Sequence, residues 1–139
     1  HFAREAESAD IDLLDTIIIA SLVEKEARVA AERRKISGVI WNRLEIGQKL
    51  QIDASVIYSL GEHREVLYYA DLEVDSPYNT YRYAGLPPGP IASPGAASIE
   101  AALNPEKHAY YYYVARGDGS HHFSSTYAEH LQAKRKYIK

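Results

Sequence analysis

The apolar run "TIIIASLV", residues 16–23, is the sequence feature that most constrains how this chain folds. A helix that spans a bilayer needs about 20 apolar residues, so this run is too short to cross a membrane. Side chains of this kind are mostly buried, and the run is therefore predicted to be the buried segment of a helix. Asp10 or Asp12 can cap the start of that helix, which is predicted to extend to about residue 31.

Two glutamates follow in the stretch "ASLVEKEARVA", residues 20–30. Because a helix turns about 100° per residue, Glu26 falls in the middle of the apolar stripe that contains Leu22 and Val23. Glu24 points about 160° away from Glu26, onto the polar face of the helix. Glu24 is therefore predicted to be a solvated surface charge.

A carboxylate in an apolar stripe must be ion-paired, hydrogen-bonded, or neutral with a raised pKa. The pattern alone leaves two interpretations of Glu26 open. In the first, Glu26 forms a buried ion pair with Arg33 or Arg43. In the second, Glu26 is a functional acid, because groups with a perturbed pKa are concentrated at functional sites.

The composition narrows the class of protein. A length of 139 residues suits one domain with a single core, and a hydrophobic content of 46% excludes disorder. The net charge of −3 gives no electrostatic basis for binding nucleic acid. Cysteine is absent, which excludes disulfides and thiolate chemistry. Methionine is also absent, so we expect an excised piece of a longer protein, with residues 1–14 as a lead-in and 15–139 as the domain.

Periodicity, capping residues and glycine stops predict the remaining elements. The first are a helix over 31–47 that stops at Gly47, a short extended piece over 49–52, and a helix over 54–61 capped by Asp53 and closed by Gly61. An irregular proline-rich segment follows over 84–95, and then a short helix over 98–103. The last are a strand over 109–115, a returning strand over 121–125, and a helix over 127–138 capped by Ser125 or Thr126. This order predicts an α+β fold, with N-terminal helices that carry the candidate glutamate, a small antiparallel sheet and a C-terminal helix.

Several kinds of catalytic site are not supported by the sequence. There is no G-x-S-x-G motif, no P-loop and no H-E-x-x-H motif. His121 and His122 are adjacent in a predicted strand, so their side chains point to opposite faces and cannot both bind one ion. No metal site and no cofactor are predicted, and "RGD" at 116–118 is interpreted as a hairpin turn.

Acid–base chemistry by carboxylates remains. Glu26 is the carboxylate whose predicted position would raise its pKa, as a general acid at neutral pH requires. A glycosidase normally needs a second carboxylate, for which Asp53 is a candidate, although capping a helix is its simpler role. A single buried glutamate favours a reaction that needs one acid–base group.

Four blocks of the sequence, in order, resemble one known family. They are "ASLVEKEA", "VIWNRLEIGQKLQIDASVIYSLG", "SPYNTYRYAGLPPGPIASPGAASIEAALNP" and "YYYVARGDGSHHFSSTYAEH". Together they resemble the catalytic domain of the endolytic murein transglycosylases, the YceG-like or MltG family, over roughly residues 15–139. The resemblance agrees with the α+β class, and an active-site helix like that of lysozyme is compatible with it.

The resemblance implies an enzyme that cuts the β-1,4 bond between N-acetylmuramic acid and N-acetylglucosamine and leaves a 1,6-anhydro end. The family's acid is the second glutamate of "E-K-E", which is Glu26 here. Ile52 departs from the family pattern, as does "AS" at 54–55, and both lie beside Asp53. The positions implied to bind substrate are Gln51, Asp53, Tyr78, Asn79, Thr80, Tyr81 and His122, with "GLPPG" at 85–89 as a cleft wall.

The resemblance also implies a membrane-anchored protein that works on the extracytoplasmic face of the bacterial cytoplasmic membrane. Its partners would be peptidoglycan glycan strands and the penicillin-binding proteins that synthesise them. The family's membrane helix and LysM-like domain are not in this sequence. Two alternatives remain: a glycan-binding or scaffold domain that does not cleave, and a hydrolase that uses Glu26 and Asp53 as a pair.

Overall fold

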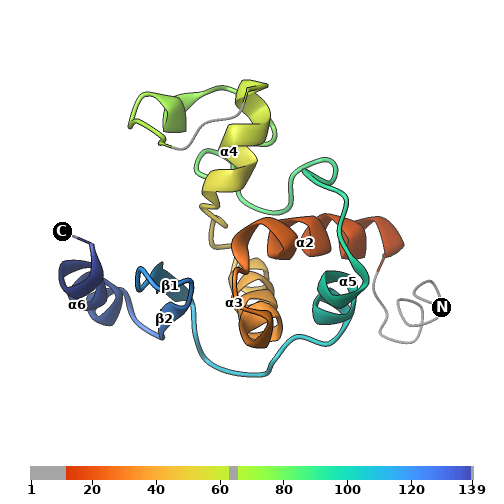
Figure 1. Cartoon of the computed structure of the whole chain (residues 1–139). Coiled ribbons are helices and arrows are strands. Elements are labelled where there is room, and N and C mark those ends of the chain that lie inside the picture. Colours follow the sequence, from red (N-terminus) through yellow and green to blue (C-terminus); the bar gives the residue numbers. More distant parts are fainter. Residues whose placement is uncertain (1–11, 63–65, 139) are drawn as a thin grey trace.

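A computed structural model describes residues 12–62 and 66–138 of the chain. Figure 1 confirms the predicted α+β class, with helices first and a small antiparallel hairpin near the C-terminus. The elements in order are α2 (Leu13–Glu26), the 3-10 turn η1 (Ala30–Glu32), α3 (Arg33–Glu45), α4 (Asp53–Leu60), the 3-10 turn η2 (Asp71–Glu73), α5 (Ala96–Leu103), β1 (Tyr112–Ala115), β2 (His121–Ser124) and α6 (Tyr127–Tyr137).

The hydrophobic core lies where α2, α3 and α5 meet (Figure 1). Leu22 and Val23 of α2 are fully buried there, as the apolar run predicts, and Ile36 of α3 packs in the same cluster. The indole of Trp41 joins α3 to α5, because its Nε1 donates to the carbonyl oxygen of Ala102 at 3.0 Å. None of the helices over residues 12–62 and 66–138 combines the length and the apolar character that a membrane span requires.

Helix α2 begins as predicted and ends earlier than predicted. Asp12 is its N-cap and accepts from the backbone N–H of Leu14 at 3.3 Å, whereas the alternative cap Asp10 lies outside the described residues. The expected extension to residue 31 is wrong, because Ala27 leaves the helix in an extended conformation (φ −80°, ψ 124°). Tertiary contacts override helix propensity here: the early end lets Glu32 of η1 reach His121 of β2.

Glu24 is not the solvated charge that the helical projection predicts. Its Oε1 accepts hydrogen bonds from the backbone N–H of Gly95 at 2.9 Å and from the hydroxyl of Ser98 at 3.0 Å. Gly95 is the N-cap residue of α5, so Glu24 caps that helix from α2. The backbone donor at Gly95 and then the Ser98 hydroxyl lower the pKa of Glu24.

The hairpin register decides which side chains face the helices. Tyr113 pairs with Phe123 and Ala115 pairs with His121, so these four share one face of the two strands. Tyr112, Val114, His122 and Ser124 share the other face. Helix α6 covers this second face, where the ring of Tyr112 lies 5.1 Å from that of His130.

The capping predictions for the later helices have mixed outcomes. Thr126 caps α6, because its hydroxyl accepts from the backbone N–H of Glu129 at 3.2 Å. Gly61 closes α4 with a φ of 74°, and Gly47 follows the end of α3 with a φ of 71°. Asp53 does not cap α4, since Ile52 is the N-cap residue and Asp53 is the first residue of the helix.

Candidate active site

Glu26 is the last residue of α2 and lies half-buried at the end of that helix nearest the hairpin (Figure 1). Its Oε1 accepts a hydrogen bond from the hydroxyl of Tyr113 in β1, at 2.7 Å. Loss of solvation raises the pKa of Glu26, and the nearby negative charge of Asp53 acts in the same direction. The partial negative charge at a helix C-terminus also disfavours an ionised carboxylate at this position.

Three groups oppose this rise in the pKa of Glu26. The largest effect comes from the Tyr113 hydroxyl, because a donated hydrogen bond stabilises the carboxylate. His121 and Arg28 contribute smaller electrostatic effects. The balance still leaves the pKa of Glu26 raised, which is the condition that a general acid at neutral pH requires.

Of the two interpretations of Glu26 that the sequence left open, the ion pair with Arg33 or Arg43 does not form. Arg43 donates instead to backbone carbonyl groups, from Nε to Tyr111 at 2.7 Å and from a terminal nitrogen to Leu50. Arg33 acts electrostatically on Glu24. Within the part of the chain that the structure describes, Glu26 is thus a hydrogen-bonded acid without an ion pair.

Asp53 and Tyr81 form a second polar pair beside Glu26. The hydroxyl of Tyr81 donates to Oδ1 of Asp53 at 2.6 Å, and burial, followed by this bond, raises the pKa of Tyr81. The negative charge of Asp53 raises the pKa of Glu26, and Glu26 in turn raises the pKa of Tyr81. The structure therefore brings the three together from α2, α4 and the 76–83 segment.

Asn79 and Thr80 lie inside the protein. Asn79 is fully buried, and its amide nitrogen donates to the carbonyl oxygens of Leu72 and Val74, each at 2.9 Å. Thr80 is also buried, and its hydroxyl accepts from the backbone N–H of Ile52 at 2.8 Å. These bonds hold the "YNTY" segment against the segment before α4, so both side chains shape the site from within.

Gln51 and Tyr78 remain accessible. Gln51 is exposed, and its φ of 51° lies in the left-handed region that non-glycine residues rarely adopt. Such strain is found most often at functional sites. Tyr78 is half-buried against the core, and its ring lies 4.8 Å from that of Tyr58. A side chain at Gly89 would crowd the Tyr78 hydroxyl, since a Cβ there would lie 2.9 Å from it.

The hairpin brings a different histidine to the site from the one expected. His122 lies on the strand face covered by α6, with its ring 5.9 Å from that of Tyr137. His121 lies on the opposite face, with its ring 5.3 Å from that of Tyr113. The structure therefore places His121, rather than the expected His122, on the strand face near Tyr113 and Glu26, because neighbouring strand residues point to opposite faces.

Sequence reasoning missed Tyr113, His121 and Glu32. A signal for the first two was present: strand alternation from the "RGDGS" turn places Tyr113 and His121 on one face. Nothing local indicated Glu32, which meets His121 only through the tertiary fold. Among residues 12–62 and 66–138, no cluster of His, Asp or Glu has the arrangement of a metal site.

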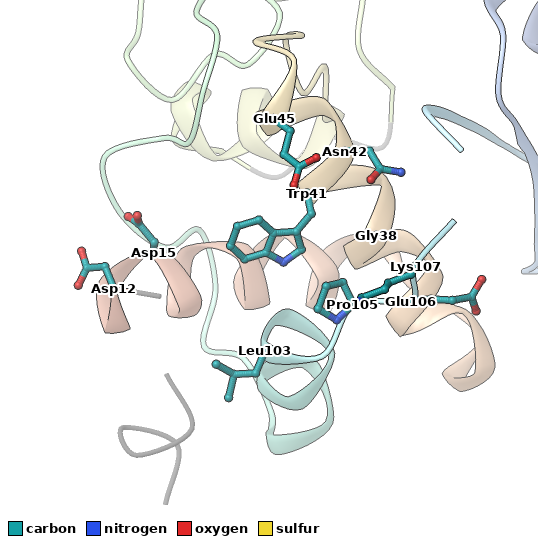
Figure 2. Close-up of a pocket in the computed structure, with 10 residues that line it drawn as sticks. All are labelled: Asp12, Asp15, Gly38, Trp41, Asn42, Glu45, Leu103, Pro105, Glu106 and Lys107. Atoms are coloured by element: carbon teal, nitrogen blue, oxygen red, sulfur yellow. The ribbon is translucent and has the colours of Figure 1, made fainter. Parts of the chain in front are cut away.

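A separate cavity of about 500 Å³ lies elsewhere in the molecule (Figure 2). Trp41 stands at the middle of this view, and Asp12 and Asp15 lie at the start of α2. At about 1.5 Å per residue, those two residues are roughly 16–21 Å along the helix from Glu26. This cavity is therefore distinct from the site around Glu26.

Comparisons with known proteins agree with the fold. The model of the YceG-like family matches residues 1–136. A crystal structure of a putative yceG-like protein from Listeria monocytogenes aligns with a TM-score of 0.88 and 44% sequence identity. That alignment covers 94% of this chain and 42% of the Listeria chain.

Two curated relatives carry the name endolytic murein transglycosylase. The protein from Bacillus subtilis strain 168 is 44% identical over 137 residues, which cover 99% of this chain and 38% of the relative. The protein from Streptococcus pneumoniae serotype 2 strain D39 is 37% identical over 114 residues, which cover 78% of this chain and 21% of the relative. The chain thus spans less than half the length of these relatives. Because the family model matches almost the whole chain, and because the sequence identity and the fold agree with it, the chain belongs to the YceG-like family.

Proposed function

We propose that this chain is the catalytic part of an endolytic lytic transglycosylase that acts on peptidoglycan. It cleaves the β-1,4 bond between N-acetylmuramic acid and N-acetylglucosamine within glycan strands and leaves a 1,6-anhydro-N-acetylmuramic acid end. The observation that carries the proposal is Glu26, a half-buried acid with a raised pKa and a hydrogen bond from Tyr113. The name of the curated relatives supports the same class of reaction.

In the proposed mechanism, Glu26 acts first as an acid and then as a base. Neutral Glu26 gives its proton to the glycosidic oxygen, and the bond between that oxygen and the muramyl C1 breaks. C1 gains oxocarbenium character, which the neighbouring N-acetyl group can stabilise. The Glu26 carboxylate then takes the proton from the sugar's O6, and O6 closes on C1. One proton moves from O6 to the leaving oxygen, and no water is consumed.

The substrate contacts in this proposal are the accessible groups near Glu26. Gln51 is exposed, so its amide can hydrogen-bond sugar hydroxyl or acetamido groups. Asp53 is exposed at the start of α4, with Tyr81 bonded to it, and Tyr78 offers a ring face. Asn79 and Thr80 support these groups from the interior, and no cofactor is required.

The proposed setting is the extracytoplasmic face of the bacterial cytoplasmic membrane, in a longer, membrane-anchored protein. Cleavage inside nascent strands would end or process them as they are made. Peptidoglycan synthases of the penicillin-binding class are the proposed protein partners, because they produce the strands that would be cut. This setting rests on the family resemblance.

One alternative is favoured by a specific observation. Asp53 raises the pKa of Glu26, so the two carboxyl groups interact, as the acid and base of a muramidase hydrolase do. A hydrolase would add water to the product, whereas a lytic transglycosylase would not.

Product mass after digestion of purified glycan strands tests the proposal. We expect fragments that end in anhydro-muramic acid and are lighter by one water than fragments with a reducing end. Glu26→Gln should abolish their release, because the loss of general acid catalysis alone lowers a rate by about 10²–10⁴-fold. Glu100→Gln, the same change at an exposed position on α5, is the control.

Two results would overturn the proposal. Reducing ends in the products, with Asp53→Asn as inactive as Glu26→Gln, would establish the two-carboxylate hydrolase. Binding to glycan strands without any new product would establish a binding module.

A further inference from the structure

We infer that Tyr113 is a positioning residue that fixes the acid proton on Oε2 of Glu26, and that a partly buried pair formed by His121 and Glu32 holds Tyr113 in place. This inference rests on the proposed role of Glu26 as the general acid. It assigns a role to three side chains that do not themselves need to touch the sugar.

The first step concerns the two oxygen atoms of Glu26. The Tyr113 hydroxyl donates to Oε1 at 2.7 Å. A neutral carboxyl group has one carbonyl oxygen, which accepts, and one hydroxyl oxygen, which carries the proton. Because Oε1 receives the donated bond, Oε1 is the carbonyl oxygen and Oε2 carries the proton that the substrate receives.

The Tyr113 hydroxyl remains a hydrogen-bond donor to Glu26. Burial and the neighbouring Glu26 raise the pKa of Tyr113 well above its ordinary value. The hydroxyl therefore keeps its proton throughout the range in which Glu26 titrates. When Glu26 becomes a carboxylate during the reaction, the same bond stabilises the new charge.

The hydrogen-bonded pair of His121 and Glu32 holds the Tyr113 ring in place. Glu32 accepts two hydrogen bonds from His121, one from the backbone N–H and one from Nδ1, each at 2.9 Å. The side chains of His121 and Glu32 are only 10% and 14% exposed. The two hydrogen bonds to the Glu32 carboxylate hold the imidazole of His121 in one orientation. The centroid of this ring lies 5.3 Å from that of the Tyr113 ring, and the two ring planes are 86° apart, which is an edge-to-face contact.

A second aromatic ring, next to that of His121, also packs against Tyr113. Phe123 lies on the same strand face, with its ring 5.9 Å from that of Tyr113. The two ring contacts limit how far the Tyr113 side chain can turn away from Glu26. Glu32 can take part because α2 ends at Glu26 and η1 turns back toward β2.

Other charged and titratable groups around Glu26 act in different ways. Asp53 raises the pKa of Glu26, and Arg28 lowers it. Tyr81 and Arg43 are also within electrostatic range of Glu26. Of the residues described, Tyr113 is the hydrogen-bond donor to the Glu26 carboxyl group, so it alone can distinguish Oε1 from Oε2 in this way.

The first test compares Tyr113→Phe with Tyr112→Phe, the neighbouring tyrosine on the strand face that α6 covers. Both changes remove one hydroxyl from β1. We expect Tyr113→Phe to lower kcat about tenfold or more, with KM within about twofold, because a hydrogen bond to a charged group is lost. The alkaline limb of its kcat–pH profile should move to higher pH, because the lost bond favoured the carboxylate form. Tyr112→Phe should change neither.

A second readout does not depend on activity. The carbon-13 shift of the Glu26 carboxyl group, followed by NMR against pH, should give a higher pKa in Tyr113→Phe than in the unchanged protein. Glu32→Gln should shift it in the same direction by a smaller amount, since the amide weakens the His121 contact and leaves Tyr113 less fixed. Glu100→Gln, the same change at an exposed position on α5, is the matched control and should leave the titration of Glu26 unchanged.

The outcomes separate this inference from the proposed function. An unchanged pH profile and an unchanged Glu26 titration in Tyr113→Phe would overturn the inference, even if Glu26→Gln is inactive. A fall in kcat without either shift would also overturn it, because it would mark Tyr113 as merely structural. A shifted titration in a protein that releases no glycan product would uphold the placement of the proton and overturn the proposed function instead.

Discussion

At the scale of single residues, the ionised form of Glu26 destabilises the folded chain. The pKa of Glu26 is raised in the folded state, so the folded protein holds this proton to a higher pH than the unfolded chain does. The contribution of Glu26 to stability is fully present below the unfolded pKa. It is lost as the pH rises through the folded pKa.

We therefore expect Glu26→Gln to match the unchanged protein in unfolding free energy in acid and to exceed it near neutral pH. The amide mimics the neutral acid, and its oxygen can still accept from Tyr113. Urea unfolding at a series of pH values measures the difference. An unchanged protein that is more stable than Glu26→Gln at pH 7 would mean that Glu26 is a charged structural residue.

The position of Glu26 on its helix follows from the sequence, whereas its hydrogen-bond partner does not. Helical period placed Glu26 in the apolar stripe, because that inference needs only the local backbone. It could not identify Tyr113 as its partner, which lies 87 positions away in sequence. The choice between His121 and His122 depended on which strand face α6 covers, and that is a property of tertiary packing.

At the scale of elements, α2 supplies α5 with a side-chain N-cap that α5 lacks on its own. Gly95 has no side chain, so the start of α5 receives its carboxylate from Glu24 in α2. A negative charge at a helix N-terminus is favourable, and donors at Gly95 and Ser98 satisfy it. The sequence predicted α5 nearly correctly, yet projection of α2 alone could not predict that Glu24 faces another helix.

Glu24→Gln should lower the unfolding free energy by about 0.5 kcal/mol, because the amide oxygen can still accept the two hydrogen bonds but the negative charge at the start of α5 is lost. The pKa of Glu24 is lowered in the folded state, so this difference should be present above the unfolded pKa and disappear as the pH falls through the folded pKa. Thermal unfolding of the variant and the unchanged protein, at neutral and at acid pH, measures the stability difference and its loss in acid. Glu100→Gln is the control, and equal effects of the two changes would contradict the capping role.

At the scale of the whole molecule, the site depends on segments that the chain brings together from a distance. The sequence predicted the order of helices and strands because each has its own period and caps. It could not predict that α2, α4 and β1 converge at one point, because long-range packing decides this. Figure 1 shows the hairpin and α6 on one side of α3, α5 on its other side, and α2 running across above α3 and α5.

Arg43 of α3 is the residue that joins these parts. Its guanidinium group donates to the carbonyl oxygens of Tyr111, just before β1, and of Lys49 and Leu50, just before Gln51. The side chain is 8% exposed, so these bonds form largely away from water. One planar group with several donors can hold both segments, whereas a lysine ammonium cannot reproduce that geometry.

Arg43→Lys should therefore lower the unfolding free energy by about 2 kcal/mol, because buried carbonyl groups lose charged donors. It should also lower the proposed transglycosylase activity, since Tyr113 and Gln51 both lie on segments that Arg43 holds. Trp41 fluorescence and far-ultraviolet circular dichroism during urea unfolding provide the measurement, and the two should give coincident transitions at a lower midpoint. Arg82→Lys, at an exposed arginine, should change the unfolding free energy by less than about 0.5 kcal/mol. Equal midpoints for the two variants would mean that the hairpin and the helical core are held together without Arg43.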